Sequence, residues 1–354
     1  MKALIAMSGG VDSSVSALLI KKQGFDCIGC TMHLYDNQDA GISKGTTCCS
    51  LDDVNDARSV ANKLGMPYYV FNFKEGFKEK VIDNFIKCYE EGLTPNPCID
   101  CNRYMKFDKL YERAKILGCD YIVTGHYAQI EKIGDKFALK KAIDPTKDQS
   151  YVLYSLTQDQ LAHTLFPLGS MQKSEVRKIA MENGFINANK HDSQDICFVP
   201  DGDYAKIIEL HTGKTYTPGN FISTEGKVLG KHKGIIHYTI GQRKGLGISS
   251  PHPLYVCEIC KANNTVKLCE NSGLYKQEVQ VENFHWIMGK PSENHIQCKA
   301  KIRYRQEEQD ATVYVTGENT IKIVFKEAQR AITPGQSAVL YDGDIVLGGG
   351  IIIK

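Results

Sequence analysis

The chain opens with a short apolar run that stops at a serine and two glycines. Ala3–Met7 has the length and composition of a buried strand, and Ser14–Lys22 spaces its apolar residues like an amphipathic helix. Between them lies the string Ser-Gly-Gly-Val-Asp-Ser, residues 8–13. Glycines at such a turn let backbone N–H groups close around an anion at the helix N-terminus. The string therefore predicts a pyrophosphate cradle, and its alternative is a plain glycine turn capped by Ser13 or Asp12.

The same alternation of strand and helix patterns continues over the first two hundred residues. The strand candidates are Ala3–Met7, Cys27–Leu34, Tyr68–Phe73 and Tyr121–Thr124. The helical patterns are Ser14–Lys22, Val54–Leu64, Phe77–Tyr89 and Lys109–Leu117. Alternation of this kind is typical of a parallel sheet wrapped by helices, so we expect an α/β fold with a doubly wound parallel sheet.

The composition and the hydrophobic pattern of the sequence change after about Pro200. Glycines and prolines become frequent, and runs such as Tyr255–Ile259 and Ile321–Phe325 have strand character. We therefore expect three domains: an α/β domain over 1–203, a small central β-rich domain over 204–275, and a C-terminal β-barrel over 276–354.

Composition limits the class of protein without identifying a partner. A net charge of +2 from 43 basic and 41 acidic residues gives no global attraction to nucleic acid, so any RNA contact must come from local patches. The 13 cysteines are odd in number and lie in a long chain, which favours reduced thiols. The sequence shows no signal-peptide core and no stretch of ~18 apolar residues that could span a membrane. We expect a cytoplasmic protein with no membrane partner.

Two cysteine-bearing segments have the character of reactive sites. Thr94–Asn102 is rich in proline and presents Cys98 and Cys101, and we expect it to be a loop ahead of a helix that begins near Lys106. Asp192–Phe198 carries Cys197 at the end of the α/β domain. The other cysteines are interpreted as small buried hydrophobes. They are Cys27, Cys30, Cys88, Cys119, Cys269 and Cys298, and with less support Cys257 and Cys260; the roles of Cys48 and Cys49 stay open.

A basic segment near the C-terminus is a candidate RNA contact. If Lys299–Arg305 is a strand, its alternation places Lys299, Lys301, Arg303 and Arg305 on one face. Four cations on one face suit a phosphate backbone, and the alternative is a solvated strand face. Basic residues also occur at 242–244 and at Lys147–Gln149, so three patches are available to one folded RNA.

The loop at 8–13 lacks the Gly-Lys-Ser/Thr ending of a Walker A loop, which argues against a kinase or GTPase. It resembles instead the loop of the ATP-pyrophosphatase (PP-loop) superfamily. The whole chain resembles the tRNA-specific 2-thiouridylases nearly end to end. The segments that carry the resemblance are 6–13, 96–102, 125–127, 147–151, 196–198, 237–247, 303–306 and 334–336.

That resemblance implies an ATP site and a metal. ATP would be bound by Ala6, Met7, Ser8, Gly9, Gly10, Val11, Asp12, Ser13, Met32 and Gly125. Asp12 would help hold Mg²⁺, and Met32 would border the adenine. Gly125 lies where open α/β sheets bind ligands, whereas His126 taken alone could equally be a histidine at the start of a helix.

The resemblance also implies a sulfur route and a tRNA surface. Cys197 would receive a persulfide from an upstream sulfur carrier or cysteine desulfurase relay, and Cys101 would resolve it through a Cys101–Cys197 disulfide. The two later domains would bind tRNA. The residues implied to contact RNA are Asn96, Pro97, Cys98, His126, Lys147, Asp148, Gln149, Arg303, Tyr304, Arg305 and Gln336.

Cys98 departs from the family pattern, in which many members carry an aspartate as the proposed general acid/base. A thiol matches that role less well. With Cys101 and Cys197 it would supply three ligands to a [4Fe-4S] cluster that leaves one iron open. Zinc is a third interpretation and would need a fourth ligand such as Cys48 or Cys49.

We therefore expect an ATP- and Mg²⁺-dependent sulfurtransferase that forms 2-thiouridine at wobble position 34 of tRNA. Two other classes stay open. One is another adenylating PP-loop enzyme, such as a lysidine synthetase or an amide-forming ligase, which uses a nitrogen nucleophile and needs no thiol. The other is a non-catalytic RNA-binding protein that retains a nucleotide site.

Overall fold

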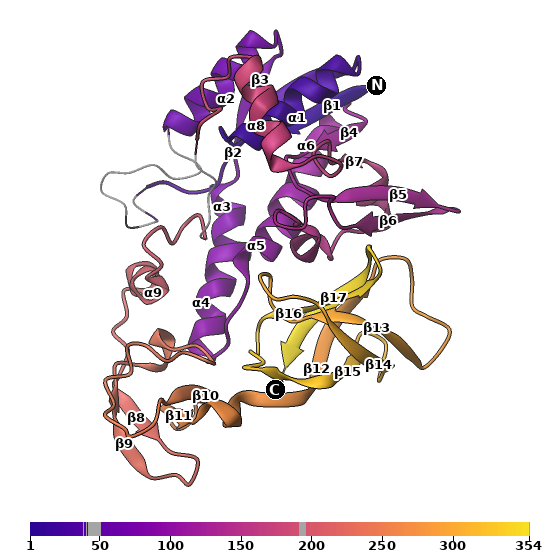
Figure 1. Cartoon of the computed structure of the whole chain (residues 1–354). Helices are drawn as coiled ribbons and strands as arrows, with labels where there is room; N and C mark the ends of the chain where they lie inside the picture. The colour runs from indigo at the N-terminus through magenta and orange to yellow at the C-terminus, as the bar shows by residue number, and fades with distance from the viewer. Residues whose placement is uncertain (38, 40, 42–50, 191–195, 354) are drawn as a thin grey trace. The chain divides into compact units, whose positions relative to one another are not determined.

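The computed structural model describes residues 1–37, 39, 41, 51–190 and 196–353. The chain divides into two compact units. Unit 1 contains residues 1–81, 98–203 and 344–346, and unit 2 contains residues 82–97, 204–343 and 347–354. Figure 1 shows the chain coloured from its N-terminus to its C-terminus.

Unit 1 is built on a parallel sheet of five strands in the order β3-β2-β1-β4-β7. The strands are β1 (Lys2–Ala6), β2 (Asp26–His33), β3 (Tyr68–Asn72), β4 (Tyr121–Val123) and β7 (Thr164–Leu165). The central strand β1 is fully apolar at Ala3, Leu4 and Ile5, and all three are buried. This pattern is typical of a strand that is covered on both faces.

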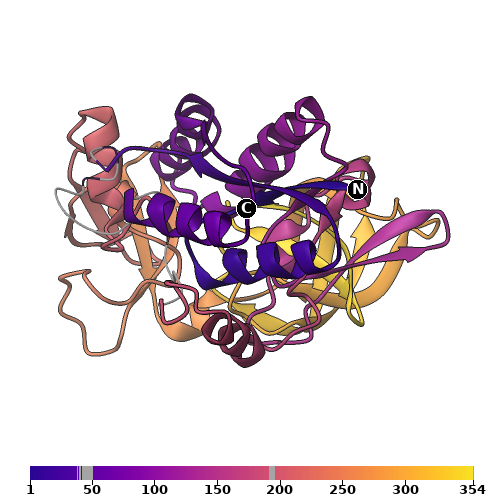
Figure 2. The ribbon, with the colours of Figure 1, turned by 90° about the horizontal axis from the view of Figure 1, so that it is seen from above.

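Helices flank this sheet on both faces (Figure 2). They include α1 (Val11–Lys22), α2 (Leu51–Lys63), α6 (Leu110–Ile116), α7 (Gln158–Ala162) and α8 (Lys173–Glu182). α1 packs against α2 and α8, whereas α6 packs against β4. The doubly wound α/β fold expected from the sequence is thereby confirmed, and the short strand β7 and the helix α8 are additions that the sequence patterns missed.

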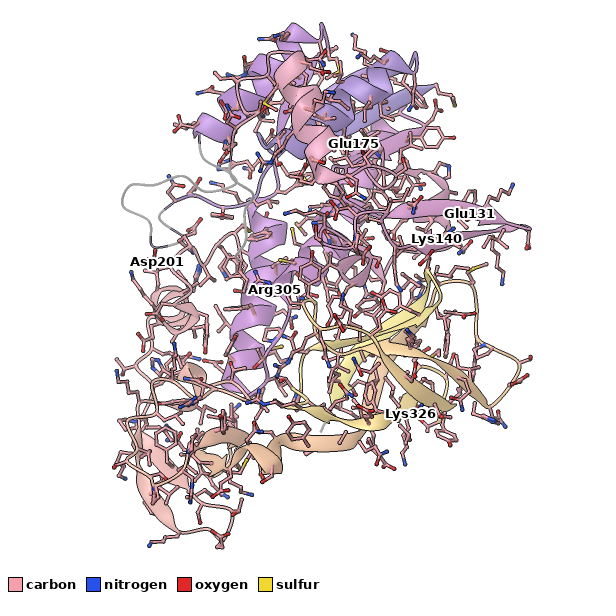
Figure 3. The ribbon with its side chains drawn as sticks, viewed as in Figure 1. Glu131, Lys140, Glu175, Asp201, Arg305 and Lys326 are labelled. Carbon is pink, nitrogen blue, oxygen red and sulfur yellow. The ribbon has the colours of Figure 1, made fainter. Side chains whose placement is uncertain are left out.

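Unit 1 also carries a hairpin, β5 (Gln129–Ile133) and β6 (Lys136–Lys140), that pairs antiparallel. Lys140 Nζ lies 2.6 Å from Glu131 Oε2 across it. Both residues are labelled in Figure 3. The helix expected at 77–89 is three consecutive segments: α3 (Lys74–Phe77), a π-helical turn (Lys78–Ile82) and α4 (Asp83–Glu90).

Unit 2 contains a closed antiparallel barrel. Its strands are β12 (Tyr275–Trp286), β13 (His295–Lys301), β14 (Gln309–Val315), β15 (Ile321–Arg330), β16 (Ser337–Asp342) and β17 (Ile345–Ile353). They follow the order β12-β15-β14-β13-β16-β17, and β17 pairs back onto β12. Its inward positions, such as Val313, Ile323 and Phe325, form one apolar core. This closure confirms the expected β-barrel.

Unit 2 also contains a smaller sheet with the order β10-β11-β8-β9. Its strands are β8 (Gly219–Ile222), β9 (Val228–His232), β10 (Tyr255–Cys260) and β11 (Thr265–Cys269), and they follow the helix α9 (Tyr204–Thr212). The apolar core of this sheet is centred on Phe221, Val256 and Val266. Among the described residues, no helix has the length and apolar character that crossing a membrane requires.

Candidate active site

The loop between β1 and α1 is closed by Ser13. The Ser13 hydroxyl donates to the Gly10 carbonyl oxygen at 3.0 Å and accepts from the Ser8 N–H at 3.2 Å. Gly9 has a φ of +77°, which residues with a side chain rarely adopt. These bonds fold the loop onto the first turn of α1 without using the N–H groups of that turn.

The N-cap residue of α1 has no side chain to satisfy the first N–H groups of the helix. That residue is Gly10, and it makes no side-chain cap hydrogen bond. The first N–H groups of a helix have no intrahelical acceptor, and the helix dipole adds partial positive charge. Asp12, one alternative cap, accepts instead from Lys173 and Tyr127. The geometry therefore favours an anion cradle over a capped glycine turn.

The cradle lies where the strand order of the sheet reverses. β1 has β2 on one side and β4 on the other, and such switch points bind ligands at the carboxyl ends of the strands. Gly125 follows β4 at this edge. A Cβ on Gly125 would lie 2.9 Å from the Ser13 nitrogen and 3.0 Å from the Asp12 carbonyl carbon. Only glycine lets the segment after β4 approach the start of α1 this closely.

Asp12 is held by two side chains that the sequence analysis did not single out. The Lys173 ammonium nitrogen lies 2.7 Å from both carboxylate oxygens of Asp12. The Tyr127 hydroxyl donates to Oδ1 at 2.8 Å. The Lys173 side chain is only 10% exposed and that of Asp12 is 30% exposed. The loop has no lysine of its own, and α8 supplies the cation that pairs with Asp12, 161 residues further along the chain.

A buried carboxylate fixes the backbone of Lys173. Asp144 Oδ2 accepts from the Lys173 N–H at 3.0 Å, while Oδ1 accepts from the backbone and hydroxyl of Thr146. Burial would raise the pKa of Asp144, but these hydrogen bonds outweigh it and hold that pKa below its usual value. Asp144 therefore stays ionised and secures the first residue of α8, where a negative charge also complements the helix dipole.

Two further residues tie the loop to the segment after α8. Asn187 Nδ2 donates to the Gly9 carbonyl and to Ser14 Oγ, both at 2.9 Å. Asn187 is 2% exposed, and its Oδ1 atom has no hydrogen-bond partner among the described residues. Lys190 binds Asp53 at 2.5 Å and Asp56 at 2.9 Å, and lies 3.4 Å from the Gly9 carbonyl. The charge of Lys190 is thus shared between two carboxylates, whereas Lys173 is directed at Asp12.

His126 is buried, at 6% exposure, in a polar chain. Lys106 Nζ lies 3.3 Å from His126 Nε2, and Thr124 Oγ1 lies 2.7 Å from Nδ1. Because an ammonium can only donate, Nε2 is the acceptor and Nδ1 carries the proton. Burial, assisted by the positive charge of Lys106, lowers the pKa of His126 well below its usual value. The ring is therefore neutral at physiological pH.

Met32 lies near the carboxyl end of β2, where it pairs with Phe71 of β3 and is half-buried. The neighbouring Thr31 hydroxyl donates to the Met7 carbonyl at 2.5 Å and lies 2.6 Å from the Tyr68 hydroxyl. β2 is therefore tied directly to the end of β1, and Met32 comes one residue after this bond.

The segment that carries Cys98 and Cys101 is helical, which corrects the expected loop. α5 (Pro97–Asp100) continues into a π-helical stretch (Cys101–Lys109) and then into α6. Pro97 begins the helix because proline suits a first helical position, where its missing N–H is not needed. Cys98 is exposed and Cys101 is half-buried. The next residue, Asn102, is fixed by a buried bond from Nδ2 to the Val152 carbonyl at 2.9 Å.

Cys197 is half-buried in unit 1. The Tyr35 hydroxyl donates to its carbonyl at 2.5 Å. The next residue, Phe198, packs edge-on against Phe77 with ring centroids 5.8 Å apart. Residues 192–195 of the expected second island lie outside the described residues, as do Cys48 and Cys49.

Burial makes several of the other cysteines unreactive. It raises the pKa of Cys27, Cys30 and Cys119, and it raises that of Cys298 to about 12. Such thiols are poor nucleophiles at neutral pH. Among the residues that the structure describes, no group of three or more His, Cys, Asp or Glu side chains could hold a metal ion.

The segment Lys147–Gln149 is ordered by its own side chains. Asp148 Oδ1 accepts from the Ala142 N–H at 2.9 Å, and Oδ2 accepts from the Ser150 hydroxyl at 2.7 Å. Gln149 exchanges two bonds with Tyr127, one from the Tyr127 N–H to Oε1 and one from the Gln149 N–H to the Tyr127 carbonyl. The segment is therefore linked to the residue that holds Asp12.

The basic strand expected at 299–305 is shorter, so the alternation of a strand does not extend to Arg303 and Arg305. β13 ends at Lys301, and residues 302–306 form bends and turns. Arg303 donates to the Ala331 carbonyl at 2.5 Å and to Thr333 Oγ1 at 2.7 Å, so it braces the barrel. Tyr304 is half-buried and Arg305 is exposed. In the basic loop at 242–244, the Gln242 amide donates to the Lys244 carbonyl at 3.0 Å.

Three family models match this chain in sequence order. The "tRNA methyl transferase HUP domain" matches residues 1–201, the "tRNA methyl transferase PRC-barrel domain" matches 206–270, and the "Aminomethyltransferase beta-barrel domain" matches 276–352. The first of these alone covers more than half of the chain.

Curated relatives match over the full length. "tRNA-specific 2-thiouridylase MnmA" of Clostridioides difficile is 55% identical over 100% of this chain and 98% of that protein. A protein of the same name from Acetivibrio thermocellus is 50% identical over 99% of both chains. A solved 4-thiouridine synthetase–RNA complex with bound ATP is 19% identical, with a TM-score of 0.36 over 59% of this chain and 50% of that chain. On the full-length identities, the chain belongs to the family of tRNA-specific 2-thiouridylases.

Proposed function

We propose that this protein replaces the O2 oxygen of the wobble uridine, position 34 of tRNA, with sulfur in an ATP-dependent reaction. One observation carries the proposal: an uncapped, glycine-rich helix start with Asp12 and Lys173 lies at the switch point of the sheet, in the same unit as Cys101 and Cys197. An anion cradle alone fits any PP-loop enzyme. The two cysteines add a means of carrying sulfur.

The proposed chemistry has two displacements. The uracil carbonyl oxygen is a poor leaving group, so O2 first attacks the α-phosphorus of ATP, the bond to the β-phosphate breaks and pyrophosphate leaves. A sulfur nucleophile then attacks C2 of the adenylated base, the C2–O2 bond breaks and AMP leaves with that oxygen. Dividing the substitution in this way replaces one difficult step with two easier ones.

In the persulfide route, the terminal sulfur on Cys197 attacks C2. The Cys101 thiolate then attacks Cys197 Sγ, so the bond between Cys197 and the transferred sulfur breaks and 2-thiouridine is released. A Cys101–Cys197 disulfide remains, and a dithiol reductant must reopen it. An upstream sulfur carrier or cysteine desulfurase relay is needed to reload Cys197, and the proposed substrate places the reaction in the cytoplasm.

The proposed nucleotide site comprises residues 6–13, Met32 and Gly125. Phosphate oxygens suit the uncapped N–H groups of α1, and the close approach of Gly125 leaves the cradle without an intruding side chain. Mg²⁺ is usually bound by one or two carboxylates together with phosphate oxygens, and Asp12 supplies one carboxylate. A metal held by Asp12 would neutralise phosphate charge, and the Lys173 ammonium beside it would add a second positive charge for the pyrophosphate.

The three cysteines fit a [4Fe-4S] cluster less well than Asp12 fits Mg²⁺. Cys98, Cys101 and Cys197 are all described, and no metal-binding group is found among them. The persulfide route needs only two of these thiols at a time. We therefore propose the persulfide route over a [4Fe-4S] route.

The proposed tRNA surface uses all three segments that the family models match. Residues 204–275 and 276–354 act as tRNA-binding domains together with the catalytic domain 1–203. Asn96, Pro97 and Cys98 lie against the target base, and the exposed Arg305 contacts phosphate. Lys147, Asp148 and Gln149 form a further contact. His126 and Tyr304 are buried or half-buried, so their RNA contacts require a base or ribose to approach closely.

The decisive experiment compares tRNA nucleosides from cells with and without the gene by mass spectrometry. Loss of 2-thiouridine at position 34, restored by the wild-type gene but not by Cys197→Ala, is the expected result. In vitro, tRNA-dependent release of AMP and pyrophosphate should accompany thiolation. Intact 2-thiouridine in the deletion strain would favour the two other classes. Among these, a lysidine synthetase or ligase would resist thiol alkylation, and a binding protein would show no ATP turnover.

A further inference from the structure

A turn of the barrel grips the chain just before α5. The turn consists of Pro334, Gly335 and Gln336, and we call it the 334–336 clamp. The Pro334 carbonyl accepts from the Thr94 N–H at 2.9 Å. Gln336 Nε2 donates to the Thr94 carbonyl at 2.8 Å and to the Pro95 carbonyl at 3.2 Å. All of these residues belong to unit 2.

The segment held by the clamp is poor in backbone donors. Pro95 and Pro97 have no N–H, so the chain around Asn96 has few donors with which to form a turn. Its carbonyl groups need external donors, because an unpaired backbone oxygen in a partly buried segment costs free energy. On the other side, the segment is anchored by a bond from the Leu93 N–H to the Cys88 carbonyl at 2.8 Å, at the end of α4. The clamp therefore supplies the second anchor.

Gly335 makes the close approach of the clamp possible. Its φ is +90°, and a Cβ there would lie 2.9 Å from the Thr94 nitrogen and 3.0 Å from the Leu93 Cβ. Backbone atoms cannot give way as a flexible side chain can. Any other residue at this position would push Leu93 and Thr94 away from the barrel.

The hydrogen bonds of Gln336 restrict what it can offer to RNA. A glutamine amide has two N–H donors, and Gln336 Nε2 lies within hydrogen-bond distance of two carbonyl oxygens, those of Thr94 and Pro95. The reverse orientation of the amide would place three oxygens together. With both of these hydrogen bonds made, Gln336 presents Oε1, an acceptor, to a tRNA.

We propose that Gln336 is a positioning residue for the target base. It holds Thr94 and Pro95 so that Asn96, Pro97 and Cys98 meet the uracil in a fixed orientation, and its effect on the reaction passes through this segment. The inference rests on the proposed function, which puts residues 96–98 against the base. A displacement of about 1 Å at such a site can cost about 100-fold in rate.

The test compares Gln336→Glu with Gln336→Met. Glutamate has the same size, but its carboxylate cannot donate and would face two carbonyls; methionine removes the donors without adding charge. Both variants should lower kcat for thiolation by about 10- to 100-fold, while the Kd for tRNA stays within about twofold. Gly335→Ala should have the same effect on kcat. It displaces Thr94 but leaves the Gln336 amide present, so its effect cannot come from a lost hydrogen bond between Gln336 and RNA. Gln297→Glu is the matched control, because Gln297 is exposed on the same barrel and bonds the Thr312 hydroxyl, away from the clamp.

Hydrogen–deuterium exchange of the full-length protein supplies a readout that does not depend on activity. The Thr94 amide should exchange faster in all three clamp variants and at the wild-type rate in Gln297→Glu, with the melting temperature measured in parallel. Weaker tRNA binding with unchanged kcat in Gln336→Glu, or normal kcat in Gly335→Ala despite faster exchange, would overturn the inference. A wild-type protein that does not thiolate tRNA would instead refute the proposed function, and unchanged Thr94 exchange would still refute the clamp.

Discussion

Lys173 and Asp12, which are 161 residues apart in the sequence, form an ion pair in which Nζ lies 2.7 Å from both carboxylate oxygens. The pair lies beside the uncapped start of α1, where the pyrophosphate of ATP is proposed to bind. Asp12 alone would make the cradle less attractive to phosphate, and Lys173 offsets that charge. Lys173 is thereby placed to stabilise the negative charge of the leaving pyrophosphate.

Lys173→Met should therefore impair adenylation more than nucleotide binding. Removing one preorganised group that stabilises developing charge typically costs about 10²–10³-fold in rate. We expect a loss of this size in tRNA-dependent AMP and pyrophosphate release, with partial recovery in Lys173→Arg. Lys178→Met is the control, because Lys178 lies on the same helix, 74% exposed, and pairs with Glu182 at 3.8 Å. Equal activity of the two methionine variants would remove Lys173 from the reaction.

Asp12→Ala should abolish turnover while the fold survives. The change frees Lys173 from its carboxylate partner but removes the proposed metal ligand, so a non-hydrolysable ATP analogue should bind with little dependence on Mg²⁺. Titration with and without Mg²⁺ measures this directly. Release of ADP and phosphate by the wild-type protein would show that the loop performs different chemistry.

Arg303 and Arg305 should behave differently. Arg303 bonds to Ala331 and Thr333, so Arg303→Ala should destabilise the barrel by about 1.5–3 kcal/mol for each bond to its charged group. Arg305 is exposed, so Arg305→Ala should lower the melting temperature less than Arg303→Ala does, and it should lower the salt slope of tRNA binding by about one unit for each phosphate that the arginine no longer neutralises. Identical stability and salt slope in the two variants would contradict this division of roles.

His126 should make stability depend on pH. Its pKa in the fold lies well below that of an exposed histidine, so between the two values the unfolded chain binds the additional proton. Unfolding then becomes easier as the pH falls through about 6.5, by at most about 1.4 kcal/mol per pH unit. In His126→Gln that contribution should disappear. Melting temperatures from pH 8 to pH 5 test this, with His232→Gln as a comparison, because burial also lowers the pKa of His232 in unit 2.

The sequence predicted those parts of the site that are local in the chain. Apolar periodicity identified β1 to β4 within one or two residues, and the glycines identified the cradle between β1 and α1. Lys173, Asn187 and Lys190 were missed because each reaches the loop from more than 160 residues away, and one lysine among many has no local signature.

Two local predictions failed for physical reasons. Pro95 and Pro97 suggested a loop at 94–102, but a proline at a first helical position starts a helix, and α5 begins at Pro97. The alternation of basic and apolar residues predicted a strand up to Arg305, but it could not predict that the chain turns after Lys301. The Arg303 side chain donates a hydrogen bond to the Ala331 carbonyl, 28 residues later, and a pattern of neighbouring residues cannot predict such a contact.

Cys98 separates the two sulfur routes. Both routes require Cys101 and Cys197, so alanine at either position should stop thiolation and decide nothing. In the persulfide route Cys98 is neither carrier nor resolving thiol, so Cys98→Ala should keep at least partial activity. Cys98→Asp should then equal or exceed it, because an aspartate restores an acid/base group beside the target base. In a cluster route Cys98 is an iron ligand, and alanine should cost both iron and activity.

The purification decides whether this comparison is valid. An exposed cluster lost in air would leave three thiols that mimic a persulfide enzyme, so protein purified without oxygen should be assayed for iron, visible absorption and thiolation. Each assay should be repeated with a persulfide donor and with free sulfide, because an open iron site would accept sulfide directly. We expect colourless, iron-free protein that is active with the persulfide donor. Brown protein that loses colour and activity together in Cys98→Ala would show that the thiols bind a cluster, and the persulfide route would have to be abandoned.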